Sequence, residues 1–157
     1  MKNKKDNPGV YIPPPLLYVV IFLAAIFIQK EIEINDSVFH LQLTKAIGII
    51  LIITSLFFTV TSLTKFFKTK NTLIPFKPAS SLQTNGIYHI SRNPMYLGLA
   101  IVYLGITCMM GNWWNIILFP LLILVVQESI IKKEEKYLRR AFGEKYLDYK
   151  NRVRRWI

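Results

Sequence analysis

Residues 94–127, PMYLGLAIVYLGITCMMGNWWNIILFPLLILVVQ, contain no Asp, Glu, Lys or Arg. A helix needs about 20 apolar residues to cross a bilayer, so this stretch is too long for one span and fits two. Gly111 and Asn112 in its middle are turn-forming residues, and the two tryptophans that follow are typical of a membrane interface. The stretch therefore predicts a tight hairpin of two membrane helices, over about 94–110 and 113–131.

Two further uncharged stretches precede this hairpin, over about 10–28 and 46–64. The chain has 157 residues, of which 52% are hydrophobic, a composition too apolar for a soluble domain of this size. We therefore expect an all-α fold, a polytopic membrane helical bundle with about four transmembrane helices, in a single domain over 1–157. Prolines at the head of the first stretch, and the lack of a small-residue cleavage site, favour a retained span over a cleaved signal.

The formal net charge is +11, which by itself would suggest nucleic-acid binding. The basic residues lie between the apolar stretches, however, which indicates a membrane surface and no nucleic-acid partner. The loop over 65–92 is basic and has no acid, whereas the loop between the first two spans is mixed. The positive-inside bias then predicts that both termini are cytoplasmic, in what we expect to be a bacterial inner membrane. The basic residues of that loop are Lys65, Lys68, Lys70, Lys77 and Arg92.

The segment after the hairpin, 132–157, is charged and predicts two amphipathic helices broken at Gly143. The second helix places an apolar and aromatic stripe beside basic residues. Two interpretations stay open: the stripe lies in the lipid headgroup layer, or the helix folds back onto its own domain. The stripe consists of Tyr146, Tyr149, Val153 and Trp156.

The stretch with most chemistry is LQTNGIYHISRNPMYLG, residues 82–98, at the start of the third span. It combines a turn at Asn85 and Gly86, cationic and aromatic side chains, and Pro94, which can open a helix. Acidic residues lie near the end of the fourth span. Because the two ends of a hairpin are neighbours, Arg92 and Tyr96 can face Glu128, Glu134 and Glu135. For Glu128 two interpretations stay open: a role in this site, or a side chain that reaches the lipid headgroups.

These motifs, GIYHISRNPMYLG followed by EEKYLRRAFGEKYLDYKNRVRRW, resemble the isoprenylcysteine carboxyl methyltransferase and phospholipid methyltransferase family. The likeness covers about Phe76 to the C-terminus. The family pattern has Arg-His-Pro before x-Tyr-x-Gly, and this chain has Asn93 at the histidine position. That departure puts any role of the histidine in doubt for this chain.

The resemblance implies a membrane methyltransferase with a pocket for S-adenosylmethionine, formed by the last two spans, the preceding loop and the C-terminal segment, and no metal. Arg92 and Tyr96 are the catalytic candidates. A carboxylate can accept hydrogen bonds from the cofactor's hydroxyl or amino groups, and a guanidinium can bind a carboxylate. The implied cofactor-binding residues are Gly86, Tyr88, Arg92, Asn93, Pro94, Tyr96, Gly98, Glu134 and Glu135.

The methyl acceptor implied by the resemblance is lipophilic: an isoprenylcysteine-type carboxylate, a phospholipid amine or a small hydrophobic molecule. A sterol-reductase-like activity is disfavoured by the short chain. The alternative from another class is a non-catalytic four-span protein that binds membrane lipids or a partner protein through its basic face. His89 can serve as a base, although a lone histidine in a loop is more often solvated or structural. The lone Cys108 excludes a disulfide within this sequence.

Overall fold

The computed structural model describes residues 8–10, 12–68 and 81–157. Within these ranges the chain is helical and has no strand, which confirms the expected fold class. The elements are α1 (Pro14–Glu31), the short 3-10 helix η1 (Ser37–His40), α2 (Gln42–Lys68), the 3-10 helix η2 (Gly86–His89), α3 (Pro94–Met110), α4 (Trp113–Val126), the π-helical segment η3 (Gln127–Ile131), α5 (Lys132–Phe142) and α6 (Glu144–Arg152).

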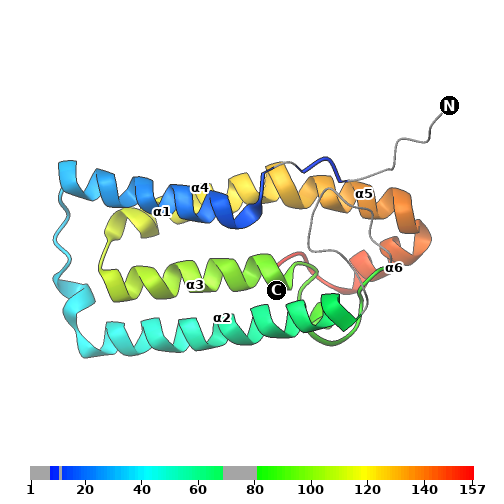
Figure 1. The fold of residues 1–157 in the computed structure, drawn as a ribbon, viewed down its shortest axis with the longest axis horizontal. Coiled ribbons are helices and arrows are strands. Elements are labelled where there is room, and N and C mark those ends of the chain that lie inside the picture. The colour runs from blue at the N-terminus through cyan, green and yellow to red at the C-terminus, as the bar shows by residue number, and fades with distance from the viewer. Residues whose placement is uncertain (1–7, 11, 69–80) are drawn as a thin grey trace.

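The long helices lie side by side in two pairs, with α3 along α2 and α4 along α1 (Figure 1). α4, η3 and α5 follow one another as one long rod, and α6 folds back beneath it at the end of the bundle that also holds η2. Three helices are long and apolar enough to cross a membrane, namely Pro14–Glu31, Gln42–Lys65 and Trp113–Phe142, and Pro94–Met110 is a shorter apolar helix. The structure is thus a helical membrane bundle.

The helix boundaries follow local chemistry. α3 begins at Pro94, whose fixed φ suits a first helical position and whose missing N–H is not needed there. It ends at Gly111, which adopts φ +73°. Asn112 then accepts a hydrogen bond from Trp114 N at 2.8 Å through its side chain and so caps α4. The expected Gly111–Asn112 turn is therefore present.

The first two helices extend beyond the uncharged stretches that the sequence marks. α1 runs to Glu31 and α2 covers 42–68, because basic residues at helix ends can stay helical while their charges reach the interface. Prolines 13–15 set the start of α1 at Pro14. The division into four spans within one domain stays a prediction. Lys70 and Lys77, two of the basic loop residues, lie outside the described residues.

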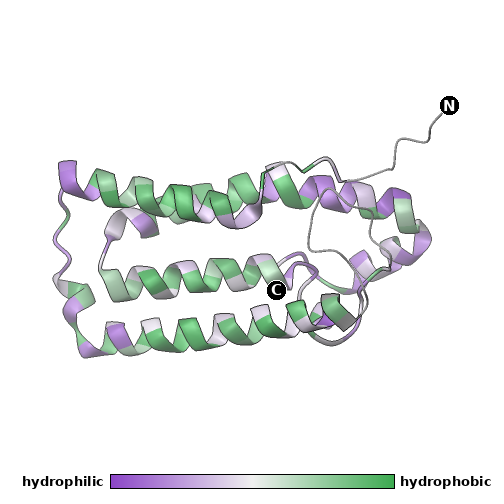
Figure 2. Cartoon of the chain, in the orientation of Figure 1, coloured by the Kyte–Doolittle hydropathy of each residue, from purple (hydrophilic) through white to green (hydrophobic). Residues whose placement is uncertain are grey.

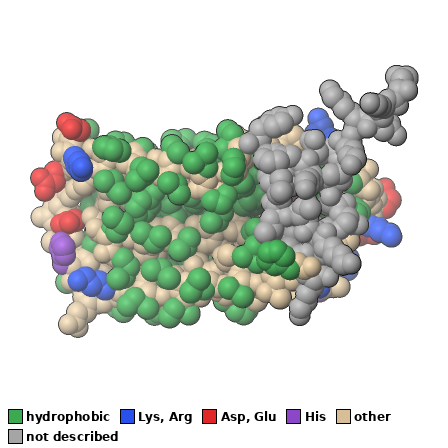
Figure 3. Space-filling view, viewed as in Figure 1, with side chains coloured by type: hydrophobic (Ala, Val, Ile, Leu, Met, Phe, Trp, Pro, Cys, Tyr) green, Lys and Arg blue, Asp and Glu red, His purple; other side chains and the backbone are tan. Residues whose placement is uncertain are grey.

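Hydropathy divides the molecule along its length. The middle of the bundle is apolar and both ends are polar (Figure 2). Apolar side chains also cover the outside of the bundle between the charged ends (Figure 3), and Phe27, Ile53 and Leu43 are each more than 60% exposed. A soluble protein rarely exposes so large an apolar surface, so this belt is the face that lipid covers.

The bundle core is small and aromatic. Tyr103 of α3 packs edge-on against Phe22 of α1, with ring centroids 5.3 Å apart, and stacks on Phe119 of α4 at 5.7 Å. Its hydroxyl donates to Asn115 Oδ1 at 2.9 Å, which satisfies a polar atom that would otherwise be costly inside the bundle. This core fixes α3 and α4 relative to each other, and so fixes the two ends that form the candidate site.

Candidate functional site

A buried ion pair joins the start of α3 to α5. Arg92 lies two residues before the first turn of α3, and its side chain is only 8% exposed. Its Nη2 is 3.2 Å from Glu135 Oε1, and its Nη1 donates to Tyr146 Oη at 3.1 Å. Its Nε is buried and has no hydrogen-bond partner among the described residues. The guanidinium therefore has one buried donor that no described residue satisfies.

A second guanidinium holds the same carboxylate. Arg155 Nε and Nη2 donate to the two oxygens of Glu135, each at 2.8 Å, in the bidentate geometry that gives strong charge-assisted bonds. The Glu135 carboxylate raises the pKa of Arg155 by accepting these bonds. Glu135 thus lies between two cations.

The C-terminal tail, residues 153–157, lies against the segment that precedes α3. Arg92 N donates to Arg154 O at 3.0 Å, and Asn93 Nδ2 donates to Arg155 O at 2.9 Å. Ser91 Oγ donates to the same Arg155 carbonyl at 3.2 Å. The residue at the family's histidine position therefore anchors the backbone of the tail.

Glu134, the other acid of the Glu-Glu pair, contacts a residue in the first turn of α3. Tyr96 Oη donates to Glu134 Oε1 at 2.6 Å, a short bond of the kind that a carboxylate acceptor gives. The carbonyl of Tyr96 in turn accepts from Tyr18 Oη of α1 at 3.2 Å. Three helices therefore meet at Tyr96.

The π-helical segment η3 sets the rotation of the two acids. Lys132 N bonds to Gln127 O, five residues back, where an α-helix would bond four back. Such a segment inserts one residue into the helix and turns the next helical residues by about 100°. The acids of α5 consequently lie on the side that faces the start of α3. Isolated π-segments are common at functional sites.

The loop that contains η2 and the helix α6 form a second, aromatic cluster beside the ion pairs. Tyr149 Oη donates to Tyr88 O at 2.7 Å, and Tyr146, Tyr149 and Val153 are all less than 10% exposed. Burial raises the pKa of Tyr146 to about 12 and that of Tyr149 further still. Tyr146 and Tyr149 lie on α6, and Val153 and Trp156 follow its end at Arg152. The stripe thus packs on its own domain and does not lie in a lipid headgroup layer, which decides between its two interpretations.

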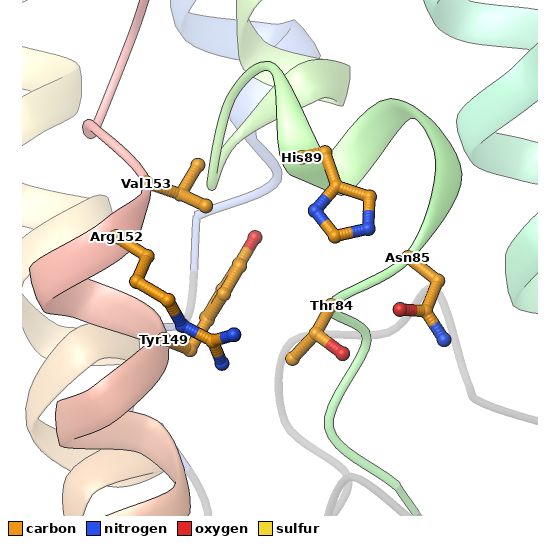
Figure 4. Close-up of a pocket in the computed structure, with 6 residues that line it drawn as sticks. All are labelled: Thr84, Asn85, His89, Tyr149, Arg152 and Val153. Carbon is orange, nitrogen blue, oxygen red and sulfur yellow. The ribbon is translucent and has the colours of Figure 1, made fainter.

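A cleft opens between the loop before η2 and the C-terminal half of α6 (Figure 4). Its volume is about 250 Å³, and neither Arg92 nor the Glu-Glu pair lines it. The lining residues are Thr84, Asn85, His89, Tyr149, Arg152 and Val153.

The structure brings together most, though not all, of the residues that the sequence singled out. Arg92 and Tyr96 each contact one acid of the pair, and Tyr88 lies in the adjoining aromatic cluster. Pro94 is the first residue of α3. Gly86, at φ +69°, lies in open space at the start of η2. Gly98 faces away from the site toward α2, where an added Cβ would lie 2.6 Å from Thr59 Oγ1.

Of the two interpretations of Glu128, the structure favours the one in which its side chain reaches the surface. Glu128 is paired with Lys132, one helical turn along, at 2.7 Å, and about half of its side chain is exposed. No hydrogen bond or ion pair joins Glu128 to Arg92 or Tyr96 among the described residues.

Sequence reasoning misses three contributors to the centre. The pattern of residues places Arg155 among surface charges and Tyr146 in an apolar stripe, and it gives no reason to single out Ser91. The bonds of the tail use backbone carbonyls, which have no residue signature in a sequence. The available signal is the RVRRW run, because several arginines beside a Glu-Glu pair have to be matched by acids if they are buried.

Comparison with known proteins agrees with the motifs that form this centre. A family model described as phospholipid methyltransferase matches residues 43–145, more than half of the chain. A protein of Haemophilus influenzae named only as uncharacterized is 42% identical over 66 residues, covering 40% of this chain and all of that protein.

Other relatives have an enzyme name. The protein-S-isoprenylcysteine O-methyltransferase of Schizosaccharomyces pombe is 38% identical over 72 residues, and protein-S-isoprenylcysteine O-methyltransferase B of Arabidopsis thaliana is 36% identical over 72 residues. Each match covers 46% of this chain, and the chain spans only 30% and 36% of these two relatives. No solved structure matches significantly. The chain therefore belongs to the isoprenylcysteine carboxyl methyltransferase and phospholipid methyltransferase family.

Proposed function

We propose that this protein transfers a methyl group from S-adenosylmethionine to a lipophilic acceptor at the cytoplasmic face of the membrane. The observation that carries the proposal is the buried centre in which Arg92, with one unpartnered donor, lies between Glu135 and Tyr146. Arg92 and Glu135 both lie inside the segment that the family model matches. An unpartnered buried donor is costly, so such a group is expected to serve a ligand.

The residues of the centre suit the proposed cofactor. Arg92 Nε can donate to a carboxylate, and Glu134 can accept from a hydroxyl or an amino group with the lone pairs that Tyr96 does not use. Tyr88 and Tyr96 have aromatic faces against which a sulfonium can lie. When bound, S-adenosylmethionine would supply a methyl group on its sulfonium, and a nucleophile of the acceptor would bond to the methyl carbon in line as the C–S bond breaks and S-adenosylhomocysteine leaves, without a metal.

The protein's own part is to position the reactants and exclude water. The double pairing of Glu135 holds Arg92 in one orientation, and the tail covers the start of α3. A site held by buried ion pairs is preorganised, which favours catalysis by orientation. The apolar belt around the bundle would let a lipophilic acceptor approach from the bilayer, and the charge pattern supports a cytoplasmic site with both termini inside. The acceptor class is an isoprenylcysteine-type carboxylate, a phospholipid amine or a small hydrophobic molecule.

The test is calorimetric titration of detergent-purified protein with S-adenosylhomocysteine, the demethylated cofactor. We expect saturable binding that Glu134→Gln weakens about tenfold, since one charged hydrogen bond is worth roughly 1.5–3 kcal/mol. Glu128→Gln is the matched control, because it removes one carboxylate from the same rod at an exposed position. Equal affinities of wild type and Glu134→Gln would remove Glu134 from the pocket.

Absence of binding in both detergent and lipid discs would contradict the methyltransferase proposal. The non-catalytic lipid-binding or partner-binding role would then explain the architecture of the bundle better. If binding is found, a screen of prenylated cysteine, phosphatidylethanolamine and small hydrophobic acids with radiolabelled methyl donor would identify the acceptor class.

A further inference from the structure

We propose that the cleft between η2 and α6 binds a phosphate group, at a site distinct from the Arg92–Glu135 centre. We call it the Arg152 cleft, and its lining residues are Thr84, Asn85, His89, Tyr149, Arg152 and Val153. Anion binding here is independent of methyl transfer, because no residue that lines the cleft belongs to the ion-paired centre.

The charge of the cleft is unbalanced. Arg152 lines it, and no acidic residue does so among the described residues. Among the described residues, the Arg152 guanidinium makes only one hydrogen bond, from Nε to Asp148 O of the same helix at 3.3 Å. Both terminal nitrogens thus remain available. Arg92, by contrast, is already matched by Glu135. A planar fork with free terminal donors is the group best suited to two oxygens of one anion.

Neutral donors surround the same space. Figure 4 shows the His89 ring and the Thr84 hydroxyl on the loop side, opposite the Arg152 guanidinium on α6. Neither His89 nor Thr84 has a side-chain hydrogen bond to any residue that the structure describes. An imidazole N–H and a hydroxyl can each donate to a further oxygen. A tetrahedral anion has enough oxygens to use all of them, whereas a carboxylate has only two.

The floor of the cleft is rigid. Tyr149 is buried and its hydroxyl is held by Tyr88 O at 2.7 Å, while Val153 N donates to Tyr149 O at 3.0 Å. Two backbone carbonyls near this end of α6 accept hydrogen bonds, Tyr149 O from Val153 N and Asp148 O from Arg152 Nε, so these two are not left open toward an anion. A preformed site loses little conformational entropy when it binds.

The cleft also lies beside the proposed methyl-transfer centre without merging into it. Tyr149 lines the cleft, and the neighbouring ring of Tyr146, with centroids 6.5 Å apart, holds Arg92 on its other side. A phosphate bound by Arg152 would therefore be separated from Arg92 by these two aromatic side chains. The phosphate can belong to a lipid headgroup or to a soluble phosphate ester. Both sources present the same phosphate oxygens to the donors of the cleft.

The experiment uses the two histidines of the chain as reporters. Full-length protein with ¹⁵N-labelled histidine, in maltoside micelles at fixed pH, is titrated with glycerol 1-phosphate in one arm and with phosphatidylglycerol in the other. His40 lies beside Asp36 at the other end of the bundle, so its ring signals serve as the internal control. We expect saturable shifts of the His89 ring signals alone, in one arm or in both. A response in the lipid arm only would assign a headgroup, and a response in the soluble arm would assign a soluble ester.

Arg152→Gln should weaken this binding about tenfold, the effect of losing one charge-assisted contact. The matched control is Lys145→Gln, which removes the same charge from an exposed position of the same helix, outside the cleft, and should leave the affinity unchanged. Saturating S-adenosylhomocysteine should not displace the phosphate. The proposal is overturned if neither arm shifts His89, if Arg152→Gln binds like wild type, or if S-adenosylhomocysteine competes, which would assign the cleft to the methyl donor.

Discussion

At the scale of single residues, Asn93 shows how a departure from the family pattern can keep a structural role. Its side-chain amide donates to Arg155 O at 2.9 Å, and the Arg155 side chain binds Glu135. Asn93 therefore acts on the centre through the tail. Proton transfer by an amide is not available, so a role that needs an acid or a base at this position has to be carried by another group.

The Asn93→Ala variant should loosen the tail. After the Asn93 donor is removed, the Arg155 carbonyl keeps only its hydrogen bond from Ser91. Loss of the Asn93 bond should lower the free energy of unfolding by roughly 0.5–1.5 kcal/mol. We expect faster amide hydrogen exchange at Arg155 and Trp156 and weaker binding of S-adenosylhomocysteine, with the bundle intact. Asn151→Ala, at an exposed position, is the matched control. Unchanged exchange in Asn93→Ala would show that the tail does not depend on this residue.

Two tyrosines of α3 should respond to loss of the hydroxyl in opposite ways. Tyr96→Phe removes the bond to Glu134 at the candidate site, so we expect weaker S-adenosylhomocysteine binding and little change in thermal stability. Tyr103→Phe leaves a buried Asn115 oxygen without its side-chain donor and should lower stability by about 1–3 kcal/mol, with binding kept. Thermal unfolding in detergent and calorimetry on both variants check this. The same response in both would contradict the separation of site from core.

At the scale of secondary-structure elements, η3 decides which way the acids of α5 point. Deleting Ser129 should convert the π-segment into a regular helix and rotate α5 by about 100° relative to α4. Glu134 and Glu135 would then leave their partners on α3 and in the tail. We expect loss of S-adenosylhomocysteine binding together with a helical content close to that of wild type by circular dichroism. Ser129→Ala, which changes an exposed side chain and keeps the register, should bind normally.

The contact of α2 with α3 depends on small residues. An added Cβ at Gly105 would lie 2.8 Å from Ile52 Cγ1 and 3.0 Å from Gly48 O, and backbone cannot move away cheaply. Gly105→Ala should therefore lower stability by about 1–3 kcal/mol, the usual effect of overpacking. Ile106→Ala, on the same helix and more than a third exposed, is the control. Thermal unfolding in maltoside measures the stability of both variants. Unchanged stability of Gly105→Ala would mean that α2 and α3 can move apart without loss of stability.

The elements also show what the sequence could predict. Pro94 and Gly111 define α3 at both ends because proline and glycine act on their own backbone, whatever surrounds them. The rotation of α5 could not be predicted, since a π-segment depends on tertiary contacts more than on residue type. The burial of the α6 stripe could not be predicted for a similar reason: Tyr146 and Tyr149 suit a headgroup layer and a protein core equally well.

At the scale of the whole molecule, the two ends of the bundle differ in the charge they expose. The end of α1 and the connection from α1 to α2 carry Glu31, Glu33 and Asp36 beside Lys30, and two tryptophan indoles donate to backbone carbonyls of this connection at Asn35 and Ile32. The opposite end carries α5 and α6 with their basic residues. By the positive-inside bias, the α1–α2 connection should face outward and the candidate site should face the cytoplasm.

Cysteine labelling tests this orientation, since the chain's one cysteine, Cys108, can be replaced by serine first. Ser37→Cys reports on the α1–α2 connection and Lys145→Cys on the α6 end, and both positions are exposed. In intact cells, with the outer barrier opened, a membrane-impermeant maleimide should label Ser37→Cys and should reach Lys145→Cys only after lysis. The reverse pattern would place the acids of α5 and the Arg152 cleft outside. A cytoplasmic methyl donor could not reach that side, so the same result would also contradict the proposed activity.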